Sequence, residues 1–151
     1  MSSGLATAPP ATDFTSAWEA FFRATRRARG RATGQLARGG LSLSQYHLLE
    51  GLRERATMTM SELALAAGVA PPTATRMLDG LVRDGLVERR ASHTDRRSVL
   101  VSLTDAGRAA VEEAAERVEQ GRTRVRDHLT PEEQEQAARL LRRLAEVVDE
   151  L

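Results

Sequence analysis

Three side chains of the kinds used in acyl transfer stand close together in one short segment. Ser92, His93 and Asp95 supply a hydroxyl, an imidazole and a carboxylate, which are the groups of a hydrolytic triad. They are crowded into a single polar turn, however, which provides neither an oxyanion hole nor a pocket for a substrate. We therefore expect the protein not to be an enzyme.

The histidines and the absence of cysteine argue against metal and thiol chemistry. His47, His93 and His128 stand far apart in the chain and lack the close spacing of a structural zinc site. Cysteine is absent, which excludes disulfide bonds, zinc–thiolate sites and thiol-based redox sensing. We expect no metal site and no cofactor.

Arginine is the residue type that best fits a chemical role. All 22 basic residues are arginines, whose planar guanidinium groups suit phosphates and guanine edges, although a GC-rich coding bias would give the same composition. The net charge of +1 hides a weak polarity, because residues 1–41 carry six arginines against two acids and residues 131–151 carry three against six. This distribution permits a face that binds nucleic acid.

The middle of the chain has the pattern of a helix-turn-helix. Thr59 and Glu62 have the spacing of a capping box and open a short helix that Gly68 ends. Pro71 and Pro72 would break the interior of a helix but suit its first turn, so a second helix should begin there. Two helices joined in this way form a helix-turn-helix.

A β-hairpin is predicted directly after this second helix. Residues 86–90 (LVERR) and 98–104 (SVLVSLT) are rich in β-branched residues and are joined by the polar segment ASHTDRR. A hairpin in this position is a wing. The complete predicted order is helix (13 to about 37), helix (from 43), helix (60–67), helix (71–85), strand (86–90), strand (98–104), helix (105–128) and helix (from 131). Ser42 with Gln45 and Thr130 with Glu133 have the spacing of a capping box at the starts of the helices from 43 and from 131.

The predicted fold class is mainly α with a small β-hairpin wing, a winged helix-turn-helix with six helices and an α-helical dimerisation region. The terminal helices carry apolar stripes wider than one small lobe can cover, which predicts a homodimer. We recognise no membrane span and no signal peptide, so we expect a cytoplasmic protein without membrane contact. The predicted parts are a disordered N-terminal tail (1–11), a helical dimerisation region (12–41 and 104–151) and a winged helix-turn-helix DNA-binding lobe (42–103).

The second helix of the helix-turn-helix should turn one face to double-stranded DNA. At 100° per residue, its apolar side chains fall within one arc and should face the core: Ala74, Met77, Leu78, Leu81 and Val82. The opposite side, which a recognition helix presents to the major groove, carries Pro72, Thr73, Thr75, Arg76, Asp79 and Arg83. We predict that Arg76 bonds to O6 and N7 of a guanine and that Thr73 and Thr75 reach phosphates or a thymine methyl group. The alternative interpretation makes Arg76 a solvated surface arginine.

The tip of the wing is predicted to contact the minor groove. Asp95 stands two residues before Arg97, so on an extended segment their side chains share a face and can pair. This pairing would direct Arg97 into a narrow minor groove, where the potential is most negative, and Arg96 would contact a phosphate. A basic hairpin without this role is the alternative.

Residues 60–108 (MSELALAAGVAPPTATRMLDGLVRDGLVERRASHTDRRSVLVSLTDAGR) resemble the DNA-binding lobe of the MarR (multiple antibiotic resistance regulator) family. The most specific matches are GLVERR, the Asp-x-Arg of Asp95 and Arg97, and VLVSLTDAGR. The resemblance implies a triangular homodimer whose first, fifth and sixth helices interlock, and whose two lobes bind the half-sites of a pseudo-palindrome with Arg97 in the minor groove. It also implies a repressor that small phenolic or aromatic carboxylate ligands release from DNA.

A crevice for such a ligand is predicted between the first two helices. An aromatic anion would find arginine counter-charges and a tyrosine hydrogen bond there. The candidate side chains are Trp18, Phe22, Arg23, Arg26, Tyr46 and His47. The alternative is that the aromatic side chains belong to the core and the arginines to a solvated face.

Two other functions are compatible with the sequence. A winged-helix protein-interaction module would turn its arginines to an acidic partner and would bind DNA weakly and indifferently. A non-specific architectural DNA binder would show the salt dependence of phosphate contacts without preferring an operator. The net charge of +1 argues against the architectural binder.

Overall fold

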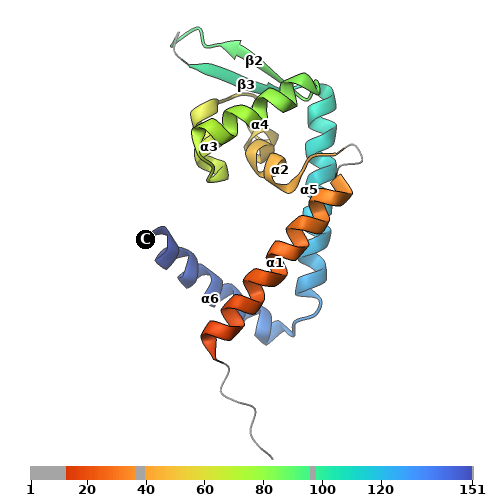
Figure 1. The fold of residues 1–151 in the computed structure, drawn as a ribbon, viewed down its shortest axis with the longest axis vertical. Coiled ribbons are helices and arrows are strands. Elements are labelled where there is room, and N and C mark those ends of the chain that lie inside the picture. Colours follow the sequence, from red (N-terminus) through yellow and green to blue (C-terminus); the bar gives the residue numbers. More distant parts are fainter. Residues whose placement is uncertain (1–12, 37–39, 96–97, 151) are drawn as a thin grey trace, which may run out of the picture.

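The computed structural model describes residues 13–36, 40–95 and 98–150. These residues form six α-helices, one short 3₁₀ helix and three β-strands (Figure 1): α1 (Phe14–Leu36), α2 (Leu43–Leu49), η1 (Glu50–Arg53), β1 (Met58–Thr59), α3 (Met60–Ala67), α4 (Pro71–Arg83), β2 (Val87–Ala91), β3 (Val99–Leu103), α5 (Asp105–Arg126) and α6 (Pro131–Asp149). This order confirms the predicted fold class, a mainly helical winged helix-turn-helix with six helices. The predicted N-terminal tail (1–11) lies outside the described residues.

Capping boxes begin three of the helices at the residues that the sequence indicated. In each box a hydroxyl oxygen accepts the N–H of the third helical residue, whose side chain accepts the N–H of the capping residue in return. The pairs are Ser42 with Gln45 (α2), Thr59 with Glu62 (α3) and Thr130 with Glu133 (α6). Each box satisfies two backbone donors that the helix itself leaves without a partner.

The wing sheet contains one strand more than predicted. β2 and β3 pair antiparallel, with Val87 opposite Leu103, and β1 pairs with the other edge of β3, with Met58 opposite Val101. The strand order is therefore β1-β3-β2. The two residues of β1 are too few to show the alternation of a strand, so the sequence pattern revealed only the helix that follows them.

The hydrophobic core lies in the lobe formed by α2, α3, α4 and the sheet, and continues onto the first half of α5. The most deeply buried side chains are Leu41, Leu48, Leu49, Leu52, Leu63, Leu78, Leu81, Val101 and Val111. On α4 the buried arc is centred on Ala74, Leu78 and Leu81. Val82 lies at the edge of this arc and is 40% exposed, so the prediction that Val82 faces the core was wrong.

The first turn of α5 holds the base of the wing. The Thr104 hydroxyl donates to the Gly85 carbonyl oxygen at 2.7 Å, and the Thr104 amide donates to the Leu86 carbonyl oxygen at 3.1 Å. Gly85 has a φ of 72°, a left-handed conformation that glycine adopts at little cost and that turns the chain from α4 into β2. The end of α4, the start of β2 and the start of α5 are therefore joined at one point.

The terminal helices α1 and α6 lie at the end of the molecule away from the wing, and α5 connects the two ends (Figure 1). None of the described side chains of α1 or α6 belongs to the core. Within the described residues, we find no helix whose length and hydropathy would allow it to cross a lipid bilayer.

Candidate nucleic-acid interface

The polar side of α4 is open to solvent. The residues of α4 that were predicted to meet DNA are all exposed: Pro72, Thr73, Thr75, Arg76 and Arg83. Ala74, Leu78 and Leu81 on the other side are buried, so packing in the core determines which face is presented. The structure brings the predicted residues together on one exposed helix face, and their contact with DNA stays a prediction.

The N-terminus of α4 offers no free backbone amide in its first turn. Pro71 and Pro72 have no N–H, and the amides of Thr73 and Ala74 both donate to the Ala70 carbonyl oxygen, at 2.9 and 3.0 Å. Helix N-termini commonly bind anions through such amides. At this end of α4 an anion must therefore be held by side chains.

The Thr75 hydroxyl is held by the helix itself. It donates to the Pro71 carbonyl oxygen at 3.0 Å, and this bond uses its only proton. The exposed side chain therefore presents a methyl group and an oxygen that accepts hydrogen bonds. Such a side chain suits a thymine methyl group better than a phosphate, which needs a donor.

A contact that sequence reasoning missed connects the wing to α4. Arg89 of β2 donates from Nη1 to Asp79 Oδ1 at 2.6 Å and from Nη2 to the Thr75 carbonyl oxygen at 3.3 Å. Its Nε atom is buried and finds no hydrogen-bond partner among the described residues. The signal for this contact was the period of two along β2, because Arg89 follows buried Val87 by two residues and so faces the same side of the sheet.

The turn of the hairpin is held by its own hydroxyl and carboxylate groups. The Ser92 hydroxyl oxygen accepts the Asp95 amide at 3.3 Å, and the Ser98 hydroxyl donates to the Asp95 carboxylate at 2.7 Å. Ser92 is buried and its oxygen serves the turn, which does not fit a nucleophile. Arg96 and Arg97 lie outside the described residues, so the pairing of Asp95 with Arg97 and the DNA contacts of both arginines stay predictions.

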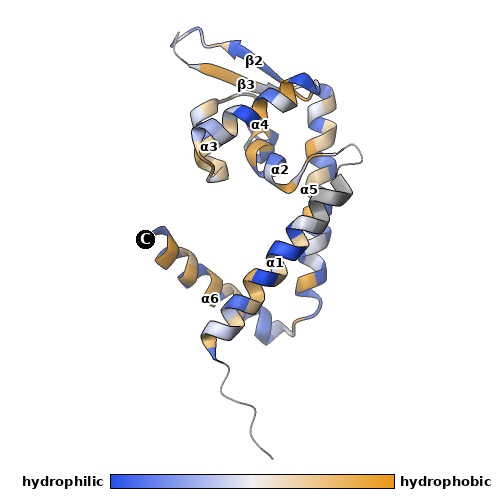
Figure 2. Cartoon of the chain, viewed as in Figure 1, coloured by the Kyte–Doolittle hydropathy of each residue, from blue (hydrophilic) through white to orange (hydrophobic). Residues whose placement is uncertain are grey.

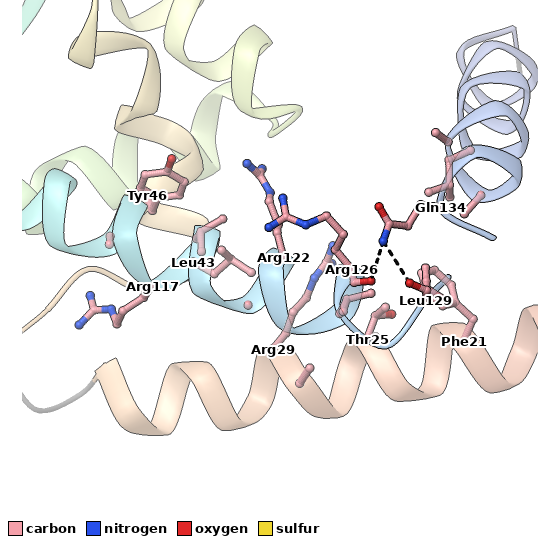
Figure 3. Close-up of a pocket in the computed structure, with 18 of the residues that line it drawn as sticks. Phe21, Thr25, Arg29, Leu43, Tyr46, Arg117, Arg122, Arg126, Leu129 and Gln134 are labelled. Carbon is pink, nitrogen blue, oxygen red and sulfur yellow. Dashed lines mark hydrogen bonds between the residues drawn. The ribbon is translucent and has the colours of Figure 1, made fainter. Parts of the chain in front are cut away.

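A cavity of about 950 Å³ lies between the lobe and the terminal helices (Figure 3). Its wall is mostly apolar and comes from α1, α2, α5, α6 and the segments next to them. The lining arginines are Arg29, Arg117, Arg122 and Arg126. Where α5 meets α6, the Gln134 side chain donates to the carbonyl oxygens of Arg126 and Leu129 at 3.2 and 3.1 Å. An apolar wall with several guanidinium groups suits an amphipathic anion.

Tyr46 is the one predicted ligand residue that lines this cavity (Figure 3). The other five candidates lie outside its lining: Trp18, Phe22, Arg23, Arg26 and His47. The face of α1 that lines the cavity carries Phe21 and Thr25 instead. The ring centroids of Trp18 and Phe22 lie 4.7 Å apart on a neighbouring face of α1. The structure therefore does not gather the six candidates into the cavity.

Apolar residues recur along α1 and α6 (Figure 2). Among the described side chains of these two helices, six apolar ones are more than half exposed: Phe14, Phe21, Leu140, Leu141, Val147 and Val148. Apolar surface of this extent is unusual on a soluble monomer and marks a surface that binds another molecule.

An ion pair connects the lobe to α5. Arg53 of η1 donates from Nε and Nη2 to the two carboxylate oxygens of Glu112, at 3.1 and 3.0 Å. These hydrogen bonds lower the pKa of Glu112 and raise the pKa of Arg53. A guanidinium group that binds a carboxylate through two parallel bonds fixes orientation as well as distance.

The model of the MarR family matches residues 41–99. The homoprotocatechuate degradative operon repressor of Escherichia coli is 31% identical over 104 residues, which are 69% of this chain and 70% of that repressor.

Two solved structures show the same fold. A mutant MarR from Escherichia coli complexed with operator DNA is similar with a TM-score of 0.70 and 30% identity, over 83% of this chain and 91% of that chain. BpsR of Bordetella bronchiseptica is similar with a TM-score of 0.72 and 27% identity, over 84% of this chain and 91% of that chain. The structure of BpsR concerns the regulation of its DNA binding by 6-hydroxynicotinic acid.

These similarities confirm the resemblance that the motifs of residues 60–108 indicated. They extend it beyond the lobe, because the matched part of the Escherichia coli repressor covers more than two thirds of both chains. The family consists of transcriptional regulators, which confirms the prediction that the protein is not an enzyme. The chain belongs to the MarR family of winged helix-turn-helix, DNA-binding transcriptional regulators.

Proposed function

We propose that the protein is a repressor that binds a pseudo-palindromic operator in double-stranded DNA as a homodimer. The observation that carries this proposal is the exposed polar face of α4, where Thr73, Thr75 and Arg76 lie together. The similarity to MarR complexed with operator DNA supports operator binding, and the relative named as an operon repressor supports repression. The protein would act in the cytoplasm.

Each residue of the interface has a distinct part in this proposal. The Arg76 fork bonds to O6 and N7 of a guanine in the major groove, and the Thr75 methyl group contacts a thymine methyl. Because the first turn of α4 has no free amide, the phosphate contacts come from the side chains of Thr73, Arg83 and Arg96. Pro72 packs against the sugar–phosphate backbone. Arg97, oriented by Asp95, enters the minor groove next to the wing.

The homodimer would cover the exposed apolar faces of α1 and α6. These helices and α5 form the proposed dimerisation region (12–41 and 104–151), and the DNA-binding lobe spans residues 42–103. Two-fold symmetry would place the two α4 helices about 34 Å apart, which is one turn of B-DNA. The proposal therefore requires two half-sites spaced by about one helical turn.

A small aromatic anion is the proposed effector, and the cavity is its proposed site. The arginines around the cavity supply counter-charge, and the Tyr46 side chain forms part of its wall. Trp18, Phe22, Arg23, Arg26 and His47 lie outside the lining, so we place the anion against Arg122 and Arg126 instead. The regulation of BpsR by 6-hydroxynicotinic acid, an aromatic carboxylate, supports this class of ligand.

The test is DNA binding measured against salt and against sequence. A duplex selected with the protein from a randomised library is compared with a random duplex by mobility shift at several salt concentrations. An operator-binding repressor should prefer the selected duplex, and its log affinity should fall with log salt by about 0.9 per phosphate contact. An architectural binder would show this slope without the preference. A protein-interaction module would bind both duplexes weakly.

A further inference from the structure

The Arg89 guanidinium lies between the wing and the helix that carries the predicted base contacts. We infer that Arg89 and Asp79 form a tie that holds the wing at one distance and angle from α4, and that this tie sets the preference for operator over other DNA. The inference rests on the proposed function, which it extends to two residues that were not assigned a DNA contact.

The geometry of the tie restricts rotation of the wing. The two acceptors, Asp79 Oδ1 and the Thr75 carbonyl oxygen, belong to residues four apart and so to one turn of α4. A guanidinium is a rigid planar fork. Because two of its nitrogens are bonded to one helical turn, β2 cannot turn relative to α4 without breaking one of the bonds. The same turn carries Arg76 on its exposed side.

Burial distinguishes the tie from an ordinary surface ion pair. The Arg89 side chain is 27% exposed, whereas that of its neighbour Arg90, which pairs with Glu88 of the same strand, is 77% exposed. The Nε of Arg89 is buried without a hydrogen-bond partner in the part of the chain that the structure describes, and this opposes folding. The Asp79 side chain is 51% exposed, and an ion pair with an exposed partner adds little to stability, so stability alone does not account for an arginine here. Orientation does.

Asp79 gains a second role from its position. It lies on the side of α4 that would face phosphates, where a free carboxylate would be repelled. Pairing with Arg89 neutralises it. A wing that is already fixed loses less conformational entropy when α4 and the wing tip bind adjacent grooves. The smaller entropy loss favours DNA sequences on which both contacts form at once.

The first experiment separates the effect of charge on DNA affinity from the effect of wing orientation on DNA preference. Asp79→Asn removes a negative charge, so simple electrostatics predicts tighter binding to every duplex. The tie predicts that binding to random duplex stays equal or rises while the ratio of selected to random affinity falls about tenfold. Arg89→Met should lower this ratio equally, and the double variant no further. Arg90→Met, with the same loss of charge on the same strand, is the matched control and should leave the ratio unchanged.

A direct DNA contact by Arg89 would give a different pattern. Asp79→Asn would then release the guanidinium for DNA, and the ratio would stay constant or rise. Either result, or losses that simply add in the double variant, would overturn the tie. Melting temperatures of all variants establish that each one is folded.

The second experiment measures the tie without DNA. Because the sequence has no cysteine, spin labels can be confined to Val82→Cys on α4 and His93→Cys in the hairpin, both exposed positions. Labelled protein is diluted with unlabelled protein so that only distances within one chain are measured. We expect a narrow distance distribution in the parent and in Arg90→Met, and a broad one in Asp79→Asn and Arg89→Met.

The two experiments separate the failure of this inference from the failure of the proposed function. A distribution that stays narrow in Asp79→Asn overturns the tie, even if the wild-type protein prefers its selected duplex. A broadened distribution in a protein that selects no DNA sequence overturns the proposed function, and with it the role of the tie in operator preference.

Discussion

Gly107 of α5 lies against the backbone of Leu86, so closely that an ideal Cβ at residue 107 would stand 1.8 Å from the Leu86 carbonyl oxygen. Gly107→Ala must therefore push the base of the wing away from α5. We expect the free energy of unfolding, measured by urea denaturation, to fall by about 2 kcal/mol. Gly121→Ala on the same helix is the control, since nothing lies within 4 Å of its added Cβ. It should stabilise the helix by up to about 1 kcal/mol, and equal losses in both variants would contradict the close approach.

The Arg53–Glu112 ion pair should make stability depend on pH. Arg53 lowers the pKa of Glu112 below its ordinary value of 4.5, so the folded protein binds this proton less readily than the unfolded chain. The stabilisation is complete above the unfolded value and is lost as the pH falls through the lowered pKa.

The measurement compares wild type with Glu112→Gln across this range. The difference in unfolding free energy between them should be constant between about pH 6 and 8 and should disappear in acid. Glu116→Gln, one turn further along the same helix, is the matched variant. If its difference from wild type follows the same course with pH, the effect does not come from the Arg53–Glu112 pair.

Replacing Arg76 by lysine should separate recognition of the guanine base from electrostatic attraction to the DNA backbone. Arg76→Lys keeps the positive charge but loses the fork that bonds to two guanine atoms at once. We expect discrimination against a duplex with the contacted guanine replaced to fall by about 1–3 kcal/mol, while the salt slope and the melting temperature stay as in wild type. An equal loss on every duplex would make Arg76 a phosphate contact.

The Thr75 side chain should act through its methyl group. Its hydroxyl proton already serves the Pro71 carbonyl oxygen, so Thr75→Val should bind the selected duplex about as tightly as wild type. Thr75→Ser removes the methyl group and should weaken binding about fourfold, the value of one buried methyl. Titration of both variants with DNA by fluorescence anisotropy measures the two affinities. If Thr75→Ser binds more tightly than Thr75→Val, the Thr75 hydroxyl rather than its methyl group contacts DNA.

The response to an aromatic anion should depend on the arginines that line the cavity. Salicylate should release wild-type protein from its selected duplex, and Arg126→Met should need a higher concentration for half release, by about tenfold for one charge-assisted hydrogen bond. Arg26→Met removes a predicted ligand residue that lies outside the lining and should respond like wild type. If only Arg26→Met changes the salicylate concentration for half release, the anion binds in the crevice predicted from the sequence and not in the cavity.

Features that depend on a few consecutive residues were recognisable from the sequence. The capping boxes at Ser42, Thr59 and Thr130 act within four residues, and the apolar spacing on α4 identified three buried positions because one helix turns uniformly. The exposed face with Arg76 followed from the same geometry. The order of helices and strands, and so the winged helix-turn-helix, could therefore be predicted.

Contacts between elements needed the tertiary structure. The Arg89–Asp79 pair joins a strand to a helix, and β1 is defined by its partner β3 rather than by its own two residues. Val82, at the edge of the buried arc of α4, is 40% exposed. The cavity likewise lies between several elements, α1, α2, α5 and α6, and Phe21 rather than Trp18 of α1 lines it. Periodicity describes one element at a time, whereas these features depend on how two elements are placed relative to each other, and that placement is decided by packing in the core.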